Sequence, residues 1–323
     1  MYSSFNIFEN KLPFLLRDYK FIKLLGKGTF SSAFEVTNDQ YNSSLCAKIA
    51  IIDQSVVAHD GSILDPELYA LLSFNHPNIV KLFDFFVIDN YVFYIIELCE
   101  NGTVQDEILK NGPMKIGRAK EIFYGIVSAL IECQRNNIAH RDIKPSNIFL
   151  SQEGKPKLGD FGLSTVLHKG KFVNNACGSL HYFAPEVISG NPFCPYMSDV
   201  YSLGVTLYYM LTGKLPDSKN SLTFPSGFNV DAKDLIIRMI DLDPHKRPYL
   251  EEIRQHSFLK VKPKGCGSGN FPPCYLSYKA PIHKDRISEA KSEKSLNLAG
   301  RTLILNKKRN YSNRIPYRVS SYN

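Results

Sequence analysis

Short apolar runs dominate the first third of the chain. Five of them are rich in β-branched and aromatic residues and are separated by turn residues: YKFIKLLG, SSAFEVTN, SLCAKIAII, IVKLFDFFVI and YVFYIIEL. Runs of this length and composition predict five strands between residues 19 and 97. One segment among them, DPELYALLSF, has helical periodicity instead. The first third is therefore predicted to form a sheet with one helix.

Helical periodicity takes over after residue 102. Apolar residues recur at i, i+3 and i+4 in DEILKN, in residues 116–136, and in SDVYSLGVTLYYMLTG, AKDLIIRMI and LEEIRQHSFL,. From residue 260 onward Gly, Pro and Lys dominate and no amphipathic period persists, which predicts a flexible tail,. The pattern predicts an α+β protein with an N-terminal extension (1–18), a folded domain (19–259) and a basic tail (260–323).

The charge is distributed unevenly over these parts. The 323 residues carry 39 Lys and Arg against 31 Asp and Glu, a net charge of +8. Residues 260–323 hold 14 of the basic and 3 of the acidic side chains, so the excess belongs to the tail. A tail containing Lys307, Lys308 and Arg309 fits localisation or docking of a partner better than nucleic-acid binding, which is the less favoured alternative.

Cysteine usage and the absence of targeting signals suggest the compartment. The seven cysteines are scattered and include no CxxC pair, which favours reduced thiols over a disulfide framework or a zinc site. The first residues lack the pattern of a secretory signal, and no apolar run approaches the roughly 18 residues of a membrane span. We expect an intracellular, monomeric protein of the cytoplasm or nucleus without a membrane span.

Five short motifs carry candidate chemistry. In residues 26–31 (GKGTFS), glycines between two strands allow the backbone to approach phosphate oxygens,. Lys48 is the one cation of an apolar strand. Residues 140–147 (HRDIKPSN) combine a carboxylate able to accept a proton, a cation for a transferring phosphate, and an amide oxygen for Mg²⁺,. Residues 160–162 (DFG) and 184–186 (APE) follow in order.

This ordered series resembles the motifs of eukaryotic protein kinases over about residues 19–259. The resemblance implies a two-lobed protein kinase fold. A small N-lobe (19–97) would contain an antiparallel five-stranded sheet and one helix, and a larger C-lobe (98–259) would be helical. ATP would bind in the cleft between the lobes. Lys144 and Ser179 are similar to the serine/threonine-specific subclass, which implies transfer of the ATP γ-phosphate to Ser or Thr hydroxyls of protein substrates, in signalling or cell-cycle control.

The resemblance also assigns roles residue by residue. Asp142 would accept the proton of the substrate hydroxyl, Lys144 would neutralise the γ-phosphate, and Lys48 would hold the α- and β-phosphates. Asn147 and Asp160 would hold Mg²⁺. The positions assigned to ATP binding are Gly26, Lys27, Gly28, Thr29, Phe30, Ser31, Ala33, Ala47, Lys48, Glu67, Glu97, Cys99 and Phe149.

Other residues resemble structural positions of the family. Asp199 is similar to the carboxylate that fixes the catalytic loop, and Arg247 is similar to the buried partner of Glu186. Tyr201 stands where a Trp is usual.

The helix of the N-lobe departs from the family pattern. Pro66 directly precedes Glu67, so the helix is predicted to start at Asp65 with Glu67 in its first turn,. We expect Glu67 to pair with Lys48. The alternative is that Glu67 only complements the helix dipole.

The segment between DFG and APE departs as well. Asn175 stands where many kinases carry a phosphorylated Thr, and no residue from 166 to 176 bears a hydroxyl. Arg141 then lacks a phosphate partner, so we expect the segment to be ordered without phosphorylation or by a partner.

Two substitutions concern substrate choice. Thr103 and Ser146 occupy places where arginine-directed kinases usually carry Glu, which predicts a weak requirement for Arg upstream of the target. The acidic residues that could still contribute a basic preference are Glu100, Asp106 and Glu107.

Short stretches are similar to Aurora, Polo and checkpoint or calcium/calmodulin-dependent kinases, and none dominates. Because every polar catalytic position is filled, we favour an active enzyme over a kinase-like scaffold (pseudokinase) that acts by binding.

Overall fold

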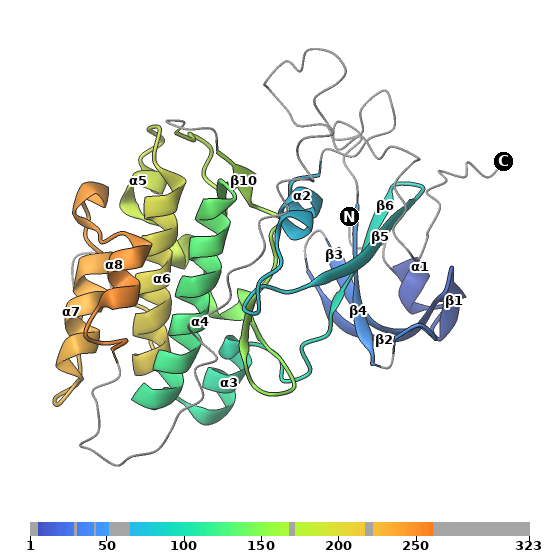
Figure 1. Ribbon diagram of the computed structural model, residues 1–323, viewed down its shortest axis with the longest axis horizontal. Coiled ribbons are helices and arrows are strands. Elements are labelled where there is room, and N and C mark those ends of the chain that lie inside the picture. Colours follow the sequence, from blue (N-terminus) through green and yellow to red (C-terminus); the bar gives the residue numbers. More distant parts are fainter. Residues whose placement is uncertain are drawn as a thin grey trace, which may run out of the picture.

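The computed structural model describes residues 6–28, 31–41, 43–51, 65–167, 172–216 and 222–260. Thr29, Phe30 and residues 261–323 of the basic tail lie outside the described residues. A twisted sheet forms one part of the molecule and a group of helices forms the other (Figure 1). The predicted order, sheet first and helices second, is confirmed.

The sheet contains the five predicted strands and one more. The predicted strands are β2 (Tyr19–Lys27), β3 (Ser31–Thr37), β4 (Leu45–Ile51), β5 (Leu82–Ile88) and β6 (Tyr91–Glu97). All neighbours pair antiparallel in the order β1-β2-β3-β4-β6-β5. All five predicted strands are present. The sheet has one further strand that was not predicted, β1 (Phe14–Leu16), which pairs with the edge of β2.

The residues before Tyr19 pack onto the outer face of this sheet. Helix α1 (Asn6–Glu9) brings the Phe8 ring to 5.1 Å from Tyr91 and 5.7 Å from Phe93, while Phe14 of β1 stacks on Phe21 at 4.6 Å. Burial of these rings supplies the driving force that a three-residue strand lacks by itself. The described part of the extension is thus a layer of the sheet lobe.

Helix α2 (Pro66–Ser73) covers the opposite, inner face. Asp65 is its N-cap and Pro66 its first residue, as predicted,. Leu68 and Leu71 of α2 are buried in the large core that extends into the helical lobe. Figure 1 shows α2 between the sheet and the helices, so α2 is in contact with both halves of the molecule.

The helical lobe is built around two long helices, α4 and α6, whose inward faces are almost wholly buried. Its helices are α3 (Val104–Asn111), α4 (Ile116–Arg135), α5 (Pro185–Ile188), α6 (Pro195–Thr212), α7 (Val230–Met239) and α8 (Leu250–Gln255). Its short strands are β7 (Ile138–Ala139), β8 (Ile148–Leu150), β9 (Pro156–Leu158) and β10 (Thr165–Val166). Its 3₁₀ turns are η2 (Pro145–Asn147), η3 (Leu180–Tyr182) and η4 (Pro244–Lys246).

Arg247 links the segment after α7 to α5 and α6. Its guanidinium binds both carboxylate oxygens of Glu186 at 2.6 and 2.8 Å and also donates to the Met197 carbonyl. It lies 5.0 Å from the centre of the Tyr201 ring, which is 2% exposed and fills the place where Trp is usual. The predicted pairing of Arg247 with Glu186 is confirmed. In the described part of the chain, no helix has the length and apolar character needed to cross a membrane.

Candidate active site

The loop from His140 to Asn147 is held by a buried carboxylate of α6. The two oxygens of Asp199 accept the backbone N–H groups of His140 and Arg141, each at 2.8 Å. Burial raises the pKa of Asp199 to about 7, although these two hydrogen bonds act in the opposite direction,. Arg141 has a positive φ of 70°, a conformation that the paired amides hold in place. The predicted role of Asp199 as the residue that fixes this loop agrees with the geometry.

His140 is a neutral structural residue of this loop. Burial lowers its pKa. Its Nε2 lies 3.0 Å from the Gly159 carbonyl, and its Nδ1 lies 3.2 Å from the Asp142 amide nitrogen. Since the carbonyl can only accept and the amide can only donate, the proton is on Nε2. The imidazole thereby links the two loops that carry Asp142 and Asp160.

Asp142 is surrounded by donors on one side only. Its Oδ2 accepts from the Asn147 amide at 2.9 Å and lies 2.7 Å from the Lys144 ammonium. Its Oδ1 is the one buried side-chain nitrogen or oxygen without a hydrogen-bond partner among the described residues. Lys144 also donates to the Ser179 hydroxyl at 2.7 Å. The carboxylate is thus oriented through one oxygen, while the other is buried without a donor.

Lys48 of β4 contacts two carboxylates across the cleft between the lobes. Its Nζ lies 2.6 and 2.9 Å from the two Glu67 oxygens and 2.7 Å from Asp160 Oδ1. Burial alone would lower the pKa of Lys48, but the two carboxylates raise it above its usual value, so the ammonium stays protonated,. The predicted Glu67–Lys48 pair is confirmed, and the alternative of a dipole role alone is not needed.

Asp160 and Phe161 turn in opposite directions. Asp160 has a φ of 61° and its side chain is 44% exposed toward the cleft. Burial would raise the pKa of Asp160, but the charge and hydrogen bond of Lys48 lower it below its usual value. Phe161 is fully buried, with its ring centre 4.8 Å from His140 and 5.2 Å from Phe74 at the end of α2. This packing joins α2 to the catalytic loop and keeps Asp160 in the cleft.

Two described glycines lie at the turn between β2 and β3, Gly26 near the end of β2 and Gly28 just after it. The Gly28 amide donates to the Ser31 carbonyl at 2.8 Å and closes the hairpin. A Cβ added at Gly26 would meet no atom within 4 Å, so the fold itself does not require a glycine there. The open space suits the approach of a ligand to the backbone. Gly26 pairs with Ala33 and Ala33 with Lys48, so these positions share one region of the sheet.

The assignment of Ala47 to the nucleotide site is wrong. Ala33 is the cross-strand partner of Lys48, whereas Ala47 pairs with Phe34 and lies fully buried in the outer core of the sheet. Successive side chains of a strand point to opposite faces. Cys46, two residues before Lys48, is therefore the residue on the Lys48 face, and sequence reasoning missed it by one position.

The end of β6 is fixed by contacts of Glu97 with Lys157 and Lys81. Glu97 Oε1 lies 2.7 Å from the Lys157 ammonium of β9, and its amide donates to the Lys81 carbonyl. Burial raises the pKa of the nearby Cys99 to about 12, so this thiol stays protonated. Phe149 of β8 lies against Gly159, where a Cβ would come within 2.9 Å of its ring. Glu97, Cys99 and Phe149 thus border the cleft between β6 and β8.

The donor set for a divalent cation is present. The amide nitrogen of Asn147 donates to the carbonyl and Oδ2 of Asp142, both at 2.9 Å, which leaves the amide oxygen free to face a ligand. Asp160 binds Lys48 through Oδ1, which leaves Oδ2. One amide oxygen and one carboxylate oxygen are hard ligands of the kind that Mg²⁺ takes together with phosphate oxygens. Asn147 and Asp160 fit Mg²⁺.

Asn175 occupies the place of the missing phosphorylated residue. The Arg141 guanidinium donates to its backbone carbonyl at 2.6 Å and to its side-chain Oδ1 at 3.0 Å. Gly178, three residues further along, has a φ of 113°, and a Cβ there would lie 2.6 Å from the Arg141 carbonyl. The segment therefore contacts the catalytic loop closely through a neutral amide.

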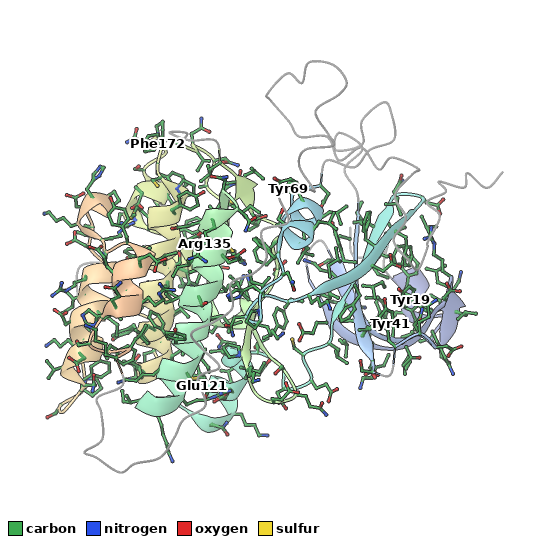
Figure 2. All side chains as sticks on the ribbon, viewed as in Figure 1. Tyr19, Tyr41, Tyr69, Glu121, Arg135 and Phe172 are labelled. Atoms are coloured by element: carbon green, nitrogen blue, oxygen red, sulfur yellow. The ribbon has the colours of Figure 1, made fainter. Side chains whose placement is uncertain are left out.

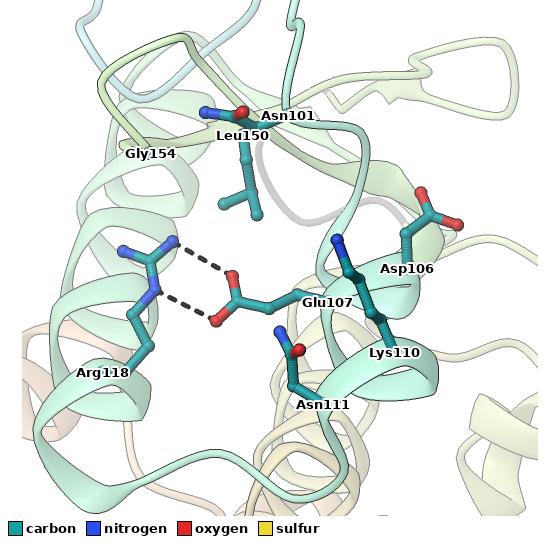
Figure 3. A pocket seen from close by; sticks show the side chains of 8 residues that line it. All are labelled: Asn101, Asp106, Glu107, Lys110, Asn111, Arg118, Leu150 and Gly154. Carbon is teal, nitrogen blue, oxygen red and sulfur yellow. Dashed lines mark hydrogen bonds and ion pairs between the residues drawn. The ribbon is translucent and has the colours of Figure 1, made fainter.

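A separate pocket of about 290 Å³ lies between α3, α4 and the turn after β8 (Figure 3). Glu107 and Arg118 form a double hydrogen bond across it, at 3.1 and 3.3 Å. Asp106 is bound to Thr103 in a capping box at the start of α3. Asp106 and Glu107, two of the three acidic residues expected to favour basic substrates, thus bind partners within the lobe. Glu100 is the third of these residues.

The protein kinase domain family matches residues 19–259. The chain belongs to this family. Its two-lobed fold agrees with the match, and so does the order of its motifs. The match begins and ends where the sequence pattern predicts the folded domain to begin and end.

Several curated relatives are serine/threonine protein kinases. The SNF1-related protein kinase catalytic subunit alpha KIN12 of Arabidopsis thaliana is 34% identical over 87% of this chain and 57% of its own length. The carbon catabolite-derepressing protein kinase of Secale cereale is 33% identical over 85% and 56%. The serine/threonine protein kinase OSK3 of Oryza sativa subsp. indica is 34% identical over 76% and 51%. This kinase chain spans little more than half the length of these relatives.

Proposed function

We propose that this chain is an ATP-dependent serine/threonine protein kinase, and that the substrate hydroxyl binds at Asp142 Oδ1. The observation that carries the proposal is the unpartnered, buried Oδ1 beside a fully occupied Oδ2. A buried acceptor without a donor is costly, and a substrate hydroxyl would satisfy it. A carboxylate placed in this way accepts the proton as the hydroxyl oxygen attacks phosphorus.

The neighbouring residues supply position and charge. Lys144, held between Asp142 and Ser179 at 2.7 Å from each, faces the transferring phosphoryl group. Lys48, fixed by Glu67 and Asp160, binds the inner phosphates. Asn147 and Asp160 would hold Mg²⁺, which would supply neutralising charge when bound. Phosphoryl transfer requires such positioning more than covalent chemistry.

The alternative, a kinase-like scaffold, is not favoured. The groups that the transfer requires, Asp142, Lys144, Lys48, Asn147 and Asp160, are present and in mutual contact. The residual space at Gly26 also supports nucleotide binding.

Substitution of Asp142 tests the proposal. Asp142→Asn keeps the size of the side chain but removes the proton acceptor, so we expect kcat on a Ser/Thr peptide library with Mg-ATP to fall about 10²- to 10⁴-fold. The melting temperature should change little. Equal phosphorylation by the two proteins would remove the enzyme proposal.

We further propose that the segment between DFG and APE, called the activation segment below, functions without phosphorylation. The reason is that the Arg141 guanidinium already donates hydrogen bonds to Asn175. Protein that became active only after phosphorylation of Ser164 or Thr165 would contradict this. We also propose a role in signalling or cell-cycle control, a cytoplasmic or nuclear location, a monomeric state and a docking partner for the basic tail.

A further inference from the structure

Glu67 lies at an unusual place for a residue that must hold Lys48. It is the second residue of α2, a helix of eight residues. The first turn of a helix has unpaired amides and frays most easily, and a helix this short is marginal alone. A contact that fixes the start of α2 is therefore needed if Glu67 is to stay 2.6 Å from the Lys48 ammonium.

Such a contact comes from the neighbouring strand. Tyr94 of β6 is the direct cross-strand partner of Lys48 on β4, so the two side chains leave the same face of the sheet. The Tyr94 hydroxyl donates to Asp65 Oδ1 at 2.8 Å. The same oxygen accepts the Leu68 amide at 2.7 Å and caps α2,. Lys48 thus binds Glu67, and its neighbour Tyr94 binds Asp65 two residues earlier.

The environment makes this hydrogen bond specific. Tyr94 is 1% exposed and lies in the core cluster that contains Leu68 and Leu71 of α2. Burial raises the pKa of its phenol, so the hydroxyl stays a donor. A buried phenol without an acceptor would pay the cost of an unsatisfied group, which disfavours any position of α2 that moves Asp65 away.

We propose that Asp65 and Tyr94 are positioning residues of the kinase reaction, which hold the first turn of α2 so that Glu67 can orient Lys48. The proposal rests on the proposed kinase activity. Neither residue is among the positions assigned to ATP binding or to the transfer step. They act through Glu67, and their loss should lower the rate of transfer more than it lowers the stability of the domain.

The chain offers a matched control for Tyr94. Tyr19 is also buried in the sheet lobe, at 3% exposure, and its hydroxyl donates to Asp84 Oδ2 at 3.0 Å. Tyr19→Phe removes the same chemical group from the same lobe without touching α2. A purely structural role of Tyr94 predicts that the two Tyr→Phe variants behave alike.

Steady-state kinetics with Mg-ATP and a peptide substrate test the proposal in the full chain. We expect Tyr94→Phe to lower kcat about fivefold to tenfold, the factor that one hydrogen bond of ordinary strength represents, with the peptide KM unchanged. Tyr19→Phe should leave kcat unchanged. Asp65→Asn, which retains an acceptor oxygen for both donors, should restore most of the activity lost in Asp65→Ala.

A double-mutant cycle identifies the route of the effect. If Tyr94 acts through Glu67, Tyr94→Phe should add no further loss of kcat in a Glu67→Gln background. A full additional loss there, or equal losses in Tyr94→Phe and Tyr19→Phe, would overturn the proposal.

Hydrogen exchange separates this inference from the proposed function. The Leu68 amide should exchange faster in Tyr94→Phe than in the wild type or in Tyr19→Phe. If the wild type transfers no phosphate, the proposed function fails, and the exchange of Leu68 still decides whether Tyr94 holds the first turn of α2. If transfer occurs and neither kcat nor the exchange responds to Tyr94→Phe, only the positioning proposal fails.

Discussion

The two halves of the active site are built in different ways. In the lower half, the catalytic loop is tied by its own backbone to Asp199, at 2.8 Å for each of two amides, and the carboxylate comes from the buried face of the 18-residue helix α6. In the upper half, Lys48 depends on a side chain from the first turn of the eight-residue helix α2. Figure 2 shows side chains packed between the long helices, and Tyr69 marks the short helix α2 between the two lobes.

This difference separates stability from activity. The lower half lies in the large core beside the long helices α4 and α6, so damage there should cost folding free energy and rate together. The upper half contributes to the same core through the short helix α2, whose Leu68 and Leu71 are buried in it. A change confined to the first turn of α2 should therefore cost less folding free energy than one in the lower half.

The largest effect is expected for Asp199→Ala. The change leaves the His140 and Arg141 amides without partners, and each unsatisfied buried donor costs about 1–3 kcal/mol. We expect the free energy of unfolding, measured with denaturant, to fall by about 2–6 kcal/mol and kcat to fall at least about a hundredfold as the loop shifts.

The matched control is Asp234→Ala on α7, where the carboxylate pairs with Arg238 and His256 and is 45% exposed. An exposed pair contributes about 0–1 kcal/mol, so this variant should remain stable and active. If both variants lost equal unfolding free energy and kcat, burial of the Asp199 carboxylate would not be the cause of the effect.

Gly178→Ala should come next. A Cβ at this residue would lie 2.6 Å from the Arg141 carbonyl, in a backbone with φ of 113°. We expect the activation segment to move off the catalytic loop and kcat to fall about a hundredfold, the cost of a displacement of about 1 Å.

Gly190→Ala separates strain from contact. Gly190 also has a positive φ, 73°, but a Cβ there meets no atom within 4 Å. This control should lose about 1–2 kcal/mol of stability through strain and keep its kcat. If both variants lost activity equally, the close approach of Gly178 to the catalytic loop would not be the cause.

A smaller effect, confined to activity, is expected for Glu67→Gln in the upper half. The amide keeps the size of the side chain but removes the charge that orients Lys48, while Asp160 still binds the ammonium. We expect kcat to fall about tenfold and the free energy of unfolding to change by less than about 1 kcal/mol, because loss of a buried charge also removes its desolvation cost.

Glu107→Gln is the matched control, since Glu107 pairs with Arg118 in the pocket of Figure 3, away from the cleft. Its kcat should equal that of the wild type. A loss of stability in Glu67→Gln as large as in Asp199→Ala would contradict the division between the two halves.

The sequence predicts the lower half of the site better than the upper half. The residues from His140 to Asn147 are contiguous, so their chemistry and their order are visible together. The upper half depends on register and on distant pairs. Ala47 was assigned in place of Cys46 because a shift of one residue along a strand reverses the face, and only the pairing of Ala33 with Lys48 reveals it.

Long-range polar contacts were also missed. Tyr94 and Asp65 are 29 residues apart, and nothing local marks their contact, although Asp65 before Pro66 does signal a helix start. Strand β1 is too short to give a period, and its stability comes from Phe8 and Phe14 packing on the sheet. The role of Glu107 depends on Arg118, which the sequence pattern does not connect to it. Asp106 is bound to Thr103, and the spacing of these two residues is that of a capping box,.

The smallest effect is expected for Asn175→Ala, in the segment that contacts the catalytic loop. Arg141 would lose the side-chain oxygen at 3.0 Å but keep the backbone carbonyl of residue 175 at 2.6 Å. One of two hydrogen bonds from an exposed guanidinium is worth about 0.5 kcal/mol or slightly more, so kcat should fall only about twofold to threefold, with unchanged stability. Asn101→Ala, which removes an amide that bonds to the Ser151 carbonyl, is the control outside the segment.

Asn175→Asp should be at least as active as the wild type, because a carboxylate binds the guanidinium more strongly than an amide. Phosphatase treatment should change none of these rates. If it abolished the activity of the wild type, the segment would depend on a phosphate, and Asn175 would not be the residue that holds it.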